Sequence, residues 1–273
     1  LKKKKNSAVY LADVHIVKIR GKARSTGGTP KTAEIIRKNG EWFISVSMEY
    51  DTIERNCGTK AVGLDWGVSH YFSTIDQDGN FEQVENPRYL RNSKERLTSL
   101  QRDLALAKKG TRTQRKLKHQ IAKLHQKIAR QRLDFTHKET AKLVEVAALI
   151  ATEKLTVKNM TRSAKGTVEK NGKMVKQKAG LNREILNTAP AMTLNLLRYK
   201  AEEASSEFVE VPTKQVKPSQ TCPDCGAKKK KSLADRWHSC ECGCEKPRDV
   251  ASAQVNLNWA LGIQAGNQPK KVA

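Results

Sequence analysis

The chain has 273 residues, with 52 Lys or Arg against 28 Asp or Glu, so its formal net charge is +24 at pH 7. Hydrophobic residues make up 37% of the sequence, a fraction too high for a disordered chain. No apolar run approaches the about 18 residues of a membrane span, and Leu1–Lys5 is basic, so we expect neither a membrane protein nor a secreted one. Each phosphate neutralised by Lys or Arg releases a counterion, so the basic excess predicts nucleic acid as the partner.

Residues 1–54 are predicted to contain β-strands. Ala8–Ile19 is rich in Val and Ile, residues 21–32 form a polar loop, and Asn39-Gly40 between two apolar stretches indicates a hairpin turn. Apolar and polar residues alternate from Trp42 to Tyr50, so one face of this strand is expected to be buried. We expect part of a small barrel. Because so few strands cannot close one, and because Leu1 is not Met, we also expect further sequence upstream.

A second unit is predicted over residues 55–262, followed by a disordered tail at 263–273. Three short apolar runs separated by turn residues predict an antiparallel meander: Ala61–Gly67, Tyr71–Ile75 and Phe81–Val84. From 92 to 150, apolar residues recur at helical spacing with a break at 108–111, which predicts an inserted helical hairpin with a basic exterior. On this hairpin we expect Arg112, Arg115 and Lys116 to contact nucleic acid. For each of these residues alone, a position on an ordinary solvated surface is an equal alternative.

Strands and helices then alternate. The predicted elements are a strand at Ala147–Val157, a polar loop at 161–182, a helix at Asn187–Ser205 and a strand at Phe208–Val211. The apolar stripe expected on that helix is Met192, Leu196, Leu197 and Tyr199. A cysteine-rich insertion at 217–246 precedes a last helix that begins at Pro247. One side of this last helix is expected to bury Val250, Ala253, Leu257, Ala260 and Leu261.

Three acidic residues stand out by their position in this order of elements. Asp65 ends the first core strand, Glu153 lies on the strand after the helical hairpin, and Asp249 lies at the start of the last helix. This order is that of an RNase H-like α/β domain, in which adjacent parallel strands bring distant residues together. Three carboxylates at one sheet edge require hard cations such as Mg²⁺ or Mn²⁺. Two such ions suit phosphodiester hydrolysis, so we expect a metal-dependent nuclease site.

Five of the six cysteines lie between residues 222 and 244, which favours a metal site in a reducing compartment over a disulfide framework. Cys222, Cys225, Cys240 and Cys242 are predicted to bind Zn²⁺ tetrahedrally in a zinc ribbon. Gly243 follows Cys242 as Gly226 follows Cys225, which favours Cys242 over Cys244; His238 is a further possible ligand. The four lysines of the ribbon tip are expected to reach phosphate, with a merely solvated loop as a nearly equal alternative: Lys228, Lys229, Lys230 and Lys231.

Several motifs together resemble the C-terminal half of the TnpB family, over roughly residues 55–262. They are Gly63-Leu64-Asp65-Trp66-Gly67, the helix at 131–138, Glu153-Lys154-Leu155, Thr221-Cys222-Pro223-Asp224-Cys225-Gly226 and Arg248-Asp249-Val250-Ala251. Residues 8–50 resemble the later strands of that family's wedge barrel. TnpB proteins are RNA-guided DNA endonucleases encoded by insertion sequences, long labelled transposases and related to compact type V CRISPR effectors.

The resemblance implies a RuvC-like nuclease in which Asp65, Glu153 and Asp249 bind the catalytic metal. It also implies a guide RNA from the transposon end, a DNA target held by backbone contacts that include Arg248, and a cytoplasmic, nucleoid-associated protein of a prokaryote. Two departures weaken the match: Pro247 replaces an acidic residue before Arg248, and the family's N-terminal recognition part has no counterpart here. The alternatives are a nuclease-silent nucleic-acid-binding protein and a transposase that joins DNA strands.

Overall fold

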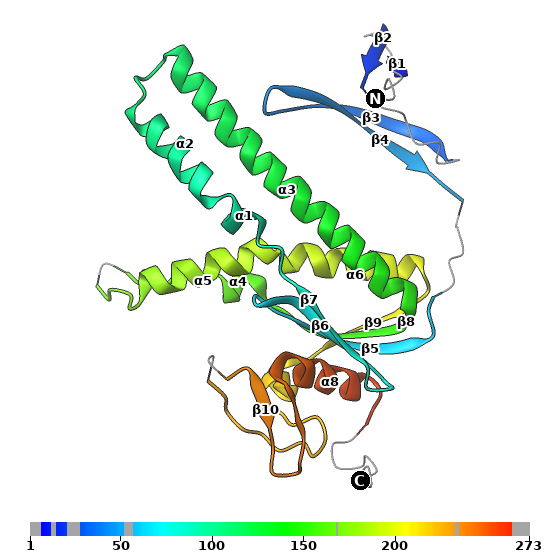
Figure 1. Ribbon diagram of the computed structural model, residues 1–273. Helices are drawn as coiled ribbons and strands as arrows, with labels where there is room; N and C mark the ends of the chain where they lie inside the picture. Colours follow the sequence, from blue (N-terminus) through cyan, green and yellow to red (C-terminus); the bar gives the residue numbers. More distant parts are fainter. Residues whose placement is uncertain are drawn as a thin grey trace. The chain divides into compact units, whose positions relative to one another are not determined.

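A computed structural model describes residues 7–11, 15–20, 28–51, 57–167, 169–232 and 235–263. The chain divides into two compact units, residues 1–53 and residues 54–273. The ribbon diagram gives the elements of each unit, which are considered separately below (Figure 1).

The first unit holds two separate antiparallel hairpins, β1 (Ser7–Leu11) with β2 (His15–Ile19) and β3 (Thr29–Lys38) with β4 (Glu41–Glu49). The predicted turn at Asn39-Gly40 is confirmed, with φ values of 53° and 80° at these residues. The polar loop is shorter than predicted, because β3 already begins at Thr29.

The prediction of a buried face on β4 is wrong for the described residues. Trp42 is 66% exposed and Val46 41% exposed. A two-stranded ribbon has no further layer to cover either of its faces, so alternation along the sequence does not produce burial here. The barrel itself stays a prediction.

The second unit is built on a mixed five-stranded sheet with the order β7-β6-β5-β8-β9. The predicted meander is present as β5 (Lys60–Trp66), β6 (His70–Asp76) and β7 (Phe81–Glu85), which pair antiparallel. β8 (Ala147–Glu153) pairs parallel to β5, and β9 (Glu207–Val211) pairs parallel to β8. The chain therefore has a mixed α/β fold in which β5 lies between β6, the next strand in the chain, and β8, which is distant in sequence.

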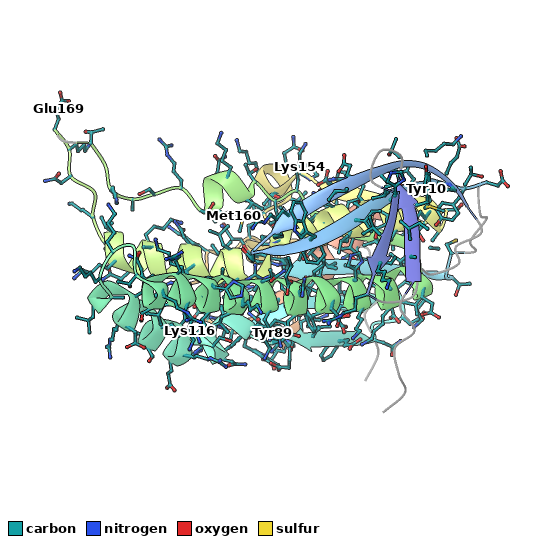
Figure 2. The ribbon with its side chains drawn as sticks, turned by 90° about the horizontal axis from the view of Figure 1, so that it is seen from above. Tyr10, Tyr89, Lys116, Lys154, Met160 and Glu169 are labelled. Atoms are coloured by element: carbon teal, nitrogen blue, oxygen red, sulfur yellow. The ribbon has the colours of Figure 1, made fainter. Side chains whose placement is uncertain are left out.

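The longer helices are α2 (Lys94–Leu106), α3 (Arg112–Val146), α5 (Val175–Thr188), α6 (Pro190–Glu203) and α8 (Arg248–Ala260). Residues of α3, α5 and α6 contribute to the core on one face of this sheet, α8 covers the other face, and α2 packs against α3. Short helical turns and a small two-stranded sheet complete the unit: α1 (Tyr89–Asn92), α4 (Val157–Met160), α7 (Thr213–Val216), the 3-10 turn η1 (Pro218–Gln220), β10 (Trp237–Ser239) and β11 (Glu245–Pro247). The helical hairpin is α2 and α3, and its predicted break at 108–111 is confirmed. The connection between α4 and α5 extends away from the helices, with Glu169 at its tip (Figure 2).

The helix predicted at Asn187–Ser205 is instead two helices, and α5 begins inside the predicted polar loop. The break lies at Ala189, whose φ is 49°. A residue before proline is excluded from the helical region, and Pro190 has no N–H to continue α5, but it is well suited to begin α6. The buried stripe of α6 also differs from the prediction, since Tyr199 is 39% exposed. The buried residues of α6 are Pro190, Thr193, Leu194, Leu197 and Ala201.

Most of the core lies on one face of the sheet, where Val62 and Leu64 of β5 pack with Leu143 of α3 and Leu197 of α6. A buried hydroxyl network strengthens this contact. The Tyr71 hydroxyl of β6 lies 2.8 Å from Thr136 Oγ1 of α3 and 2.6 Å from Thr193 Oγ1 of α6. It therefore fixes both helices to the sheet with hydrogen bonds as well as apolar contacts.

The opposite face is covered by α8, which buries Val250 and Ala253 against Ile75 of β6 (Figure 1). Burial on α8 is wider than the single side predicted, because the helix lies between the sheet and η1 and also contacts β10 and β11. Leu261 is not part of this contact, because it is 40% exposed just beyond the end of the helix. None of the helices in the described ranges has the combined length and apolar character needed to cross a bilayer.

Gly63 sets how closely α8 approaches the sheet. A Cβ atom at this residue would lie 2.0 Å from the carbonyl oxygen of Ala253. We therefore expect Gly63→Ala to displace α8 and to lower the free energy of unfolding by about 1–3 kcal/mol or more, as overpacked cores do. Urea denaturation measures this change. Gly180→Ala is the control, because that helical glycine of α5 has open space around it. The alanine there should be neutral or stabilising. Equal stability of the two variants would contradict the close approach.

Candidate active site and metal centre

A row of polar side chains crosses the sheet on the face that α8 covers. In the strand register, Gln83 of β7 is opposite Ser73 of β6, and Ser73 is opposite Asp65 of β5. Asp65 and Glu153 each follow directly on the paired residues Leu64 and Thr152 of the parallel strands β5 and β8. Because carboxyl ends of neighbouring parallel strands meet at one sheet edge, these two acidic residues lie side by side.

Asp249 is brought to the same edge by the first turn of α8. One turn further along this helix, Ser252 donates a hydrogen bond of 3.2 Å to Asp65 Oδ1. Asp249 Oδ2 lies 3.9 Å from the point that a Cβ of Gly67 would occupy, two residues after Asp65. The three acidic residues predicted from the sequence therefore gather at one place, although they are up to 184 positions apart in the chain (249 − 65).

The electrostatics of the edge also link the three groups. Burial raises the pKa of the Asp65 carboxyl well above its usual value, and the charges of Glu153 and Asp249 raise it further. The Ser252 hydrogen bond and the Arg248 charge act in the opposite direction but are weaker. Burial likewise raises the pKa of Glu153. The site thus concentrates negative charge that a bound cation would neutralise.

The spacing of the carboxylates bears on how many cations they could hold. In the described ranges, the groups of three or more possible ligand atoms that all lie within 4.8 Å of one another involve cysteines, and the three carboxylates do not form such a group. Two ions about 3.5–4 Å apart have ligands on both sides of the pair. Their ligand atoms are therefore more widely spread than the ligand atoms of a single ion, as the three carboxylates are here.

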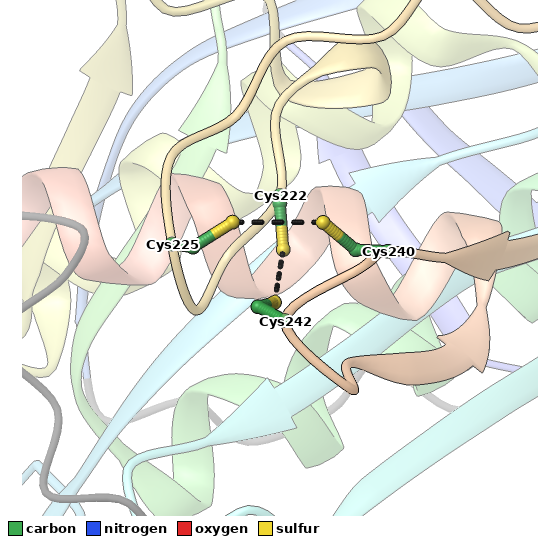
Figure 3. A group of neighbouring side chains, drawn as sticks. All are labelled: Cys222, Cys225, Cys240 and Cys242. Carbon is green, nitrogen blue, oxygen red and sulfur yellow. Dashed lines mark hydrogen bonds between the residues drawn. The ribbon is translucent and has the colours of Figure 1, made fainter.

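The cysteine cluster is formed by two loops of the ribbon. In each, a glycine with positive φ closes a tight turn: Gly226 N–H bonds to Cys222 O, and Gly243 N–H bonds to Cys240 O. Cys222, Cys225, Cys240 and Cys242 face one another, with all four sulfur atoms within 4.8 Å (Figure 3). The Sγ–Sγ distances are 3.6 Å for Cys222–Cys242 and 3.5 Å for Cys225–Cys240. A tetrahedron with Zn–S bonds of about 2.3 Å has edges of about 3.8 Å, so the cluster fits zinc without rearrangement.

The cysteine thiols of the ribbon differ in their pKa values. The backbone N–H of Cys242 is the main cause that lowers the pKa of Cys240 to about 7. Burial raises the pKa of Cys222, and it raises the pKa of Cys244 far more strongly. Cys240 is therefore the most readily deprotonated, while free Cys244 stays a thiol at neutral pH.

Cys244 belongs to a second, fully buried group with Cys222 and His238. The Lys231 ammonium contacts Nδ1 of His238, and burial followed by this positive charge lowers the pKa of the imidazole. A metal ion at this group would lie next to a cation, which opposes its binding. The four-cysteine cluster is thus the better metal site, and Lys231 lies inside the ribbon instead of reaching outward with its neighbours.

The other basic residues predicted to contact nucleic acid occupy different surroundings. Lys228, Lys229 and Lys230 are exposed. Arg248 binds the ribbon itself, because its Nη1 donates to the carbonyl oxygens of Ser232 at 2.8 Å and Asp235 at 3.2 Å. An exposed group is at the start of α3, a helix of 35 residues and so about 52 Å long (Figure 2). This group is Arg112, Arg115 and Lys116.

Sequence reasoning missed the polar neighbours of the acidic edge, namely Ser73, Gln83, Ser252 and His70. The first residue of β6 is His70, and its Nδ1 lies 3.9 Å from Asp249 Oδ2. Only the strand register reveals Ser73, Gln83 and His70. Ser252 could have been found, because it is three residues after Asp249 and therefore on the same helix face.

The fold and the site define a mixed α/β protein with an acidic sheet edge and a four-cysteine ribbon. Residues 43–164 match the family model OrfB_IS605, described as "Probable transposase", and residues 191–256 match "Cas12f1-like, TNB domain". These matches confirm the resemblance to the TnpB family identified from the sequence motifs.

Two curated relatives agree with this resemblance. The chain is 32% identical over 252 residues to "Putative RNA-guided DNA endonuclease InsQ" of Escherichia coli (strain K12), covering 92% of this chain and 60% of that protein. It is 30% identical over 241 residues to a "Putative RNA-guided DNA endonuclease" of Streptomyces pristinaespiralis, covering 88% and 55%. The chain therefore spans little more than half the length of these relatives.

Similar solved structures include a Cas12f1-sgRNA-target DNA complex, with a TM-score of 0.49, 17% identity and coverage of 83% of this chain and 55% of that one. A CRISPR-Cas12f ternary complex has a TM-score of 0.48, 16% identity and coverage of 80% and 42%.

Substitution of single cysteines tests the metal centre. We expect the wild-type chain to bind one zinc and Cys242→Ser to lose it, because a structural site needs all four ligands. Cys244→Ser is the matched control, two residues away, and should keep one zinc per chain. Elemental analysis of the purified variants measures the stoichiometry. If Cys244→Ser lost zinc and Cys242→Ser kept it, Cys244 would be the fourth ligand and Cys242 would not be a ligand.

The raised pKa of Asp65 predicts a pH dependence of stability in the absence of added divalent cations. The folded state binds the proton of this carboxyl more tightly than the unfolded state, so its contribution is present below the unfolded pKa of about 3.9 and is lost as pH rises through the folded value. In urea denaturation without Mg²⁺, Asp65 should thus add to the free energy of unfolding a contribution that falls as pH rises, and Asp65→Asn should remove this contribution from the pH slope. Glu153 adds a contribution of the same sign. Asp78→Asn, on an exposed turn, should leave the slope unchanged; an equal slope for wild type and Asp65→Asn would refute the prediction.

Proposed function

We propose that this chain is the nuclease part of a metal-dependent, RNA-guided DNA endonuclease of a transposable element, with an RNase H-like, RuvC-like fold. The observation that carries the proposal is the meeting of Asp65, Glu153 and Asp249 at one sheet edge, where Glu153 and Asp249 both raise the pKa of Asp65. The strand order β7-β6-β5-β8-β9, antiparallel on one side of β5 and parallel on the other, supports the RNase H-like assignment. The printed names of the two relatives support RNA-guided cleavage of DNA.

The acidic edge has the donor chemistry that Mg²⁺ or Mn²⁺ prefers, because it offers carboxylate oxygens and no sulfur. When bound, these ions would supply activation of water and neutralisation of the leaving oxygen in phosphodiester hydrolysis. Asp65, Glu153 and Asp249 would hold them. The hydrogen bond from Ser252 to Asp65 Oδ1 restricts the rotation of this carboxylate, as outer-sphere partners of metal ligands do.

The remaining parts have supporting roles in this proposal. Residues 1–54 form the wedge-like segment, residues 55–262 form the nuclease domain and the cysteine cluster binds structural zinc. Exposed Lys228, Lys229 and Lys230, with the basic residues at the start of α3, contact the backbones of the DNA target and guide RNA. Arg248 fixes the ribbon next to Asp249, a role better supported by its two carbonyl partners than direct phosphate binding.

Substitution of the acidic residues tests the proposed chemistry. Loss of an outer-sphere partner of a metal ligand already costs about 10- to 100-fold. We therefore expect Asp65→Ala, Glu153→Ala and Asp249→Ala each to reduce Mg²⁺-dependent cleavage of guide-matched DNA by at least that factor, while nucleic-acid binding is retained. The assay uses RNA transcribed from the transposon end that flanks the gene.

Asp78→Asn is the control for this experiment, because it removes an exposed carboxylate from the β6–β7 turn. Cleavage by Asp65→Ala at the wild-type rate would refute the proposed role of Asp65 in metal-dependent cleavage. Tight, salt-sensitive binding by a wild-type chain that does not cut would favour the nuclease-silent binding protein. Joining of DNA ends would instead indicate a transposase.

A further inference from the structure

The polar row on the sheet continues past the carboxylates to a histidine that the proposed chemistry does not use. His70 begins β6, and its side chain is 31% exposed, whereas Ser73 behind it on the same strand is buried. Nε2 of Gln83 lies 3.1 Å from Ser73 Oγ and 3.2 Å from His70 Nδ1. Gln83 of the sheet thus contacts one edge of the imidazole, and the rest of the ring is partly exposed.

The contact with Gln83 fixes which ring nitrogen carries the proton. An amide nitrogen has two N–H groups and can only donate, so one bonds to Ser73 Oγ and the other to His70 Nδ1. Nδ1 is then an acceptor, and in the neutral imidazole the proton lies on Nε2. The nearby carboxylate oxygen of Glu85 is 3.8 Å from Nε2, beyond hydrogen-bond distance, and the Glu85 side chain is 84% exposed. The Nε2–H group is therefore available to a ligand.

The His70 side chain lies beside the acidic edge. His70 Nδ1 and Asp249 Oδ2 are 3.9 Å apart, too far for a hydrogen bond. A Cβ at Gly67 would be 2.9 Å from the His70 carbonyl oxygen and 3.9 Å from Asp249 Oδ2, so the backbone of His70 also lies close to Asp249.

We propose that His70 binds a backbone phosphate of the nucleic-acid strand at the acidic edge through Nε2–H, with Gln83 as the residue that positions its ring. This inference rests on the proposed function, which brings that strand to the carboxylates. A strand passing three carboxylates needs hydrogen-bond donors for its own phosphates, and His70 supplies one beside Asp249. Ser73 and Gln83 supply no such donor, because Ser73 is buried and the Gln83 amide N–H groups are directed at Ser73 and His70.

Single-turnover cleavage of guide-matched DNA tests the contact. A hydrogen bond to a charged group contributes about 1.5–3 kcal/mol, so His70→Ala should slow cleavage about 10- to 100-fold. His70→Gln places an amide N–H near the position of Nε2 and should keep most of the rate. His70→Asn is too short to do so and should behave like the alanine variant. Gln83→Leu should slow cleavage less than His70→Ala, and His125→Ala, an exposed histidine on α3, should not affect it.

Chemical substitution of the DNA locates the contact. A neutral methylphosphonate at the phosphate bound by His70 should remove the difference between wild type and His70→Ala, whereas methylphosphonates elsewhere should preserve it. Cleavage by wild type but not by Asp65→Ala, together with wild-type rates for His70→Ala, would overturn this inference and leave the proposed function standing. Cleavage by Asp65→Ala at the wild-type rate would overturn the proposed function.

A readout without cleavage completes the test. Nitrogen NMR of ¹⁵N-histidine-labelled protein should show His70 as the Nε2–H tautomer in the wild type and a mixture in Gln83→Leu. Addition of a short oligothymidylate with Ca²⁺ should shift the Nε2 resonance of His70 and leave that of His125 unchanged. An Nδ1–H tautomer, or no shift on addition of DNA, would overturn the proposal even if the chain does not cut.

Discussion

The parallel pairing of β5 with β8 is the constraint on which the acidic edge depends. It places Asp65 and Glu153 side by side, and neither has a basic side chain as a hydrogen-bond partner in the described contacts. Hydrophobic packing of Val62, Leu64 and Ile150 on the other face holds the two strands together. Burial of these side chains contributes about 1.5–3 kcal/mol each, enough to tolerate mutual repulsion of the carboxylates. The core thus maintains an arrangement of charge that would not form on its own.

The approach of α8 adds the third carboxylate and depends on small or polar residues at the contact. Gly63 allows the backbone of α8 to approach β5, and buried Asn256 donates 2.9 Å from its Nδ2 to the carbonyl oxygen of Leu64. On β5 these contacts are made by the two residues that immediately precede Asp65. A larger apolar residue at either position would bury more surface but would move Asp249 away from its neighbours. The packing here favours the geometry of the site over maximal stability.

Much of this arrangement could be predicted from local sequence, and the exceptions have clear physical causes. Asp65 at the end of a short apolar run, Asp249 at a helix start and the Asn39-Gly40 turn are signals contained within a few residues. The predicted burial of Trp42 is wrong, because the alternation of apolar and polar residues shows which residues share a face of the strand but not whether another layer covers that face. The break at Ala189 was missed even though Pro190 indicates it. His70 and Gln83 could not be found, since their meeting depends on strand register and on the irregularity between His70 and Phe72.

The ribbon and the acidic edge share α8, so neither is structurally independent of the other. The Arg248 backbone N–H bonds to Arg236 O, the Arg248 side chain holds the loop at Ser232, and Asn258 Nδ2 bonds to Pro223 O at 2.8 Å. Contacts from the ribbon therefore reach both ends of α8, and the residue next to Asp249 makes one of them. With zinc in the cysteine cluster, as proposed, the ribbon would fold around its metal and fix the helix that carries Asp249. In the proposed function, displacement of the ribbon by a bound nucleic acid would move the helix that carries Asp249, and nucleic-acid binding at the ribbon would then be coupled to the geometry of the acidic edge.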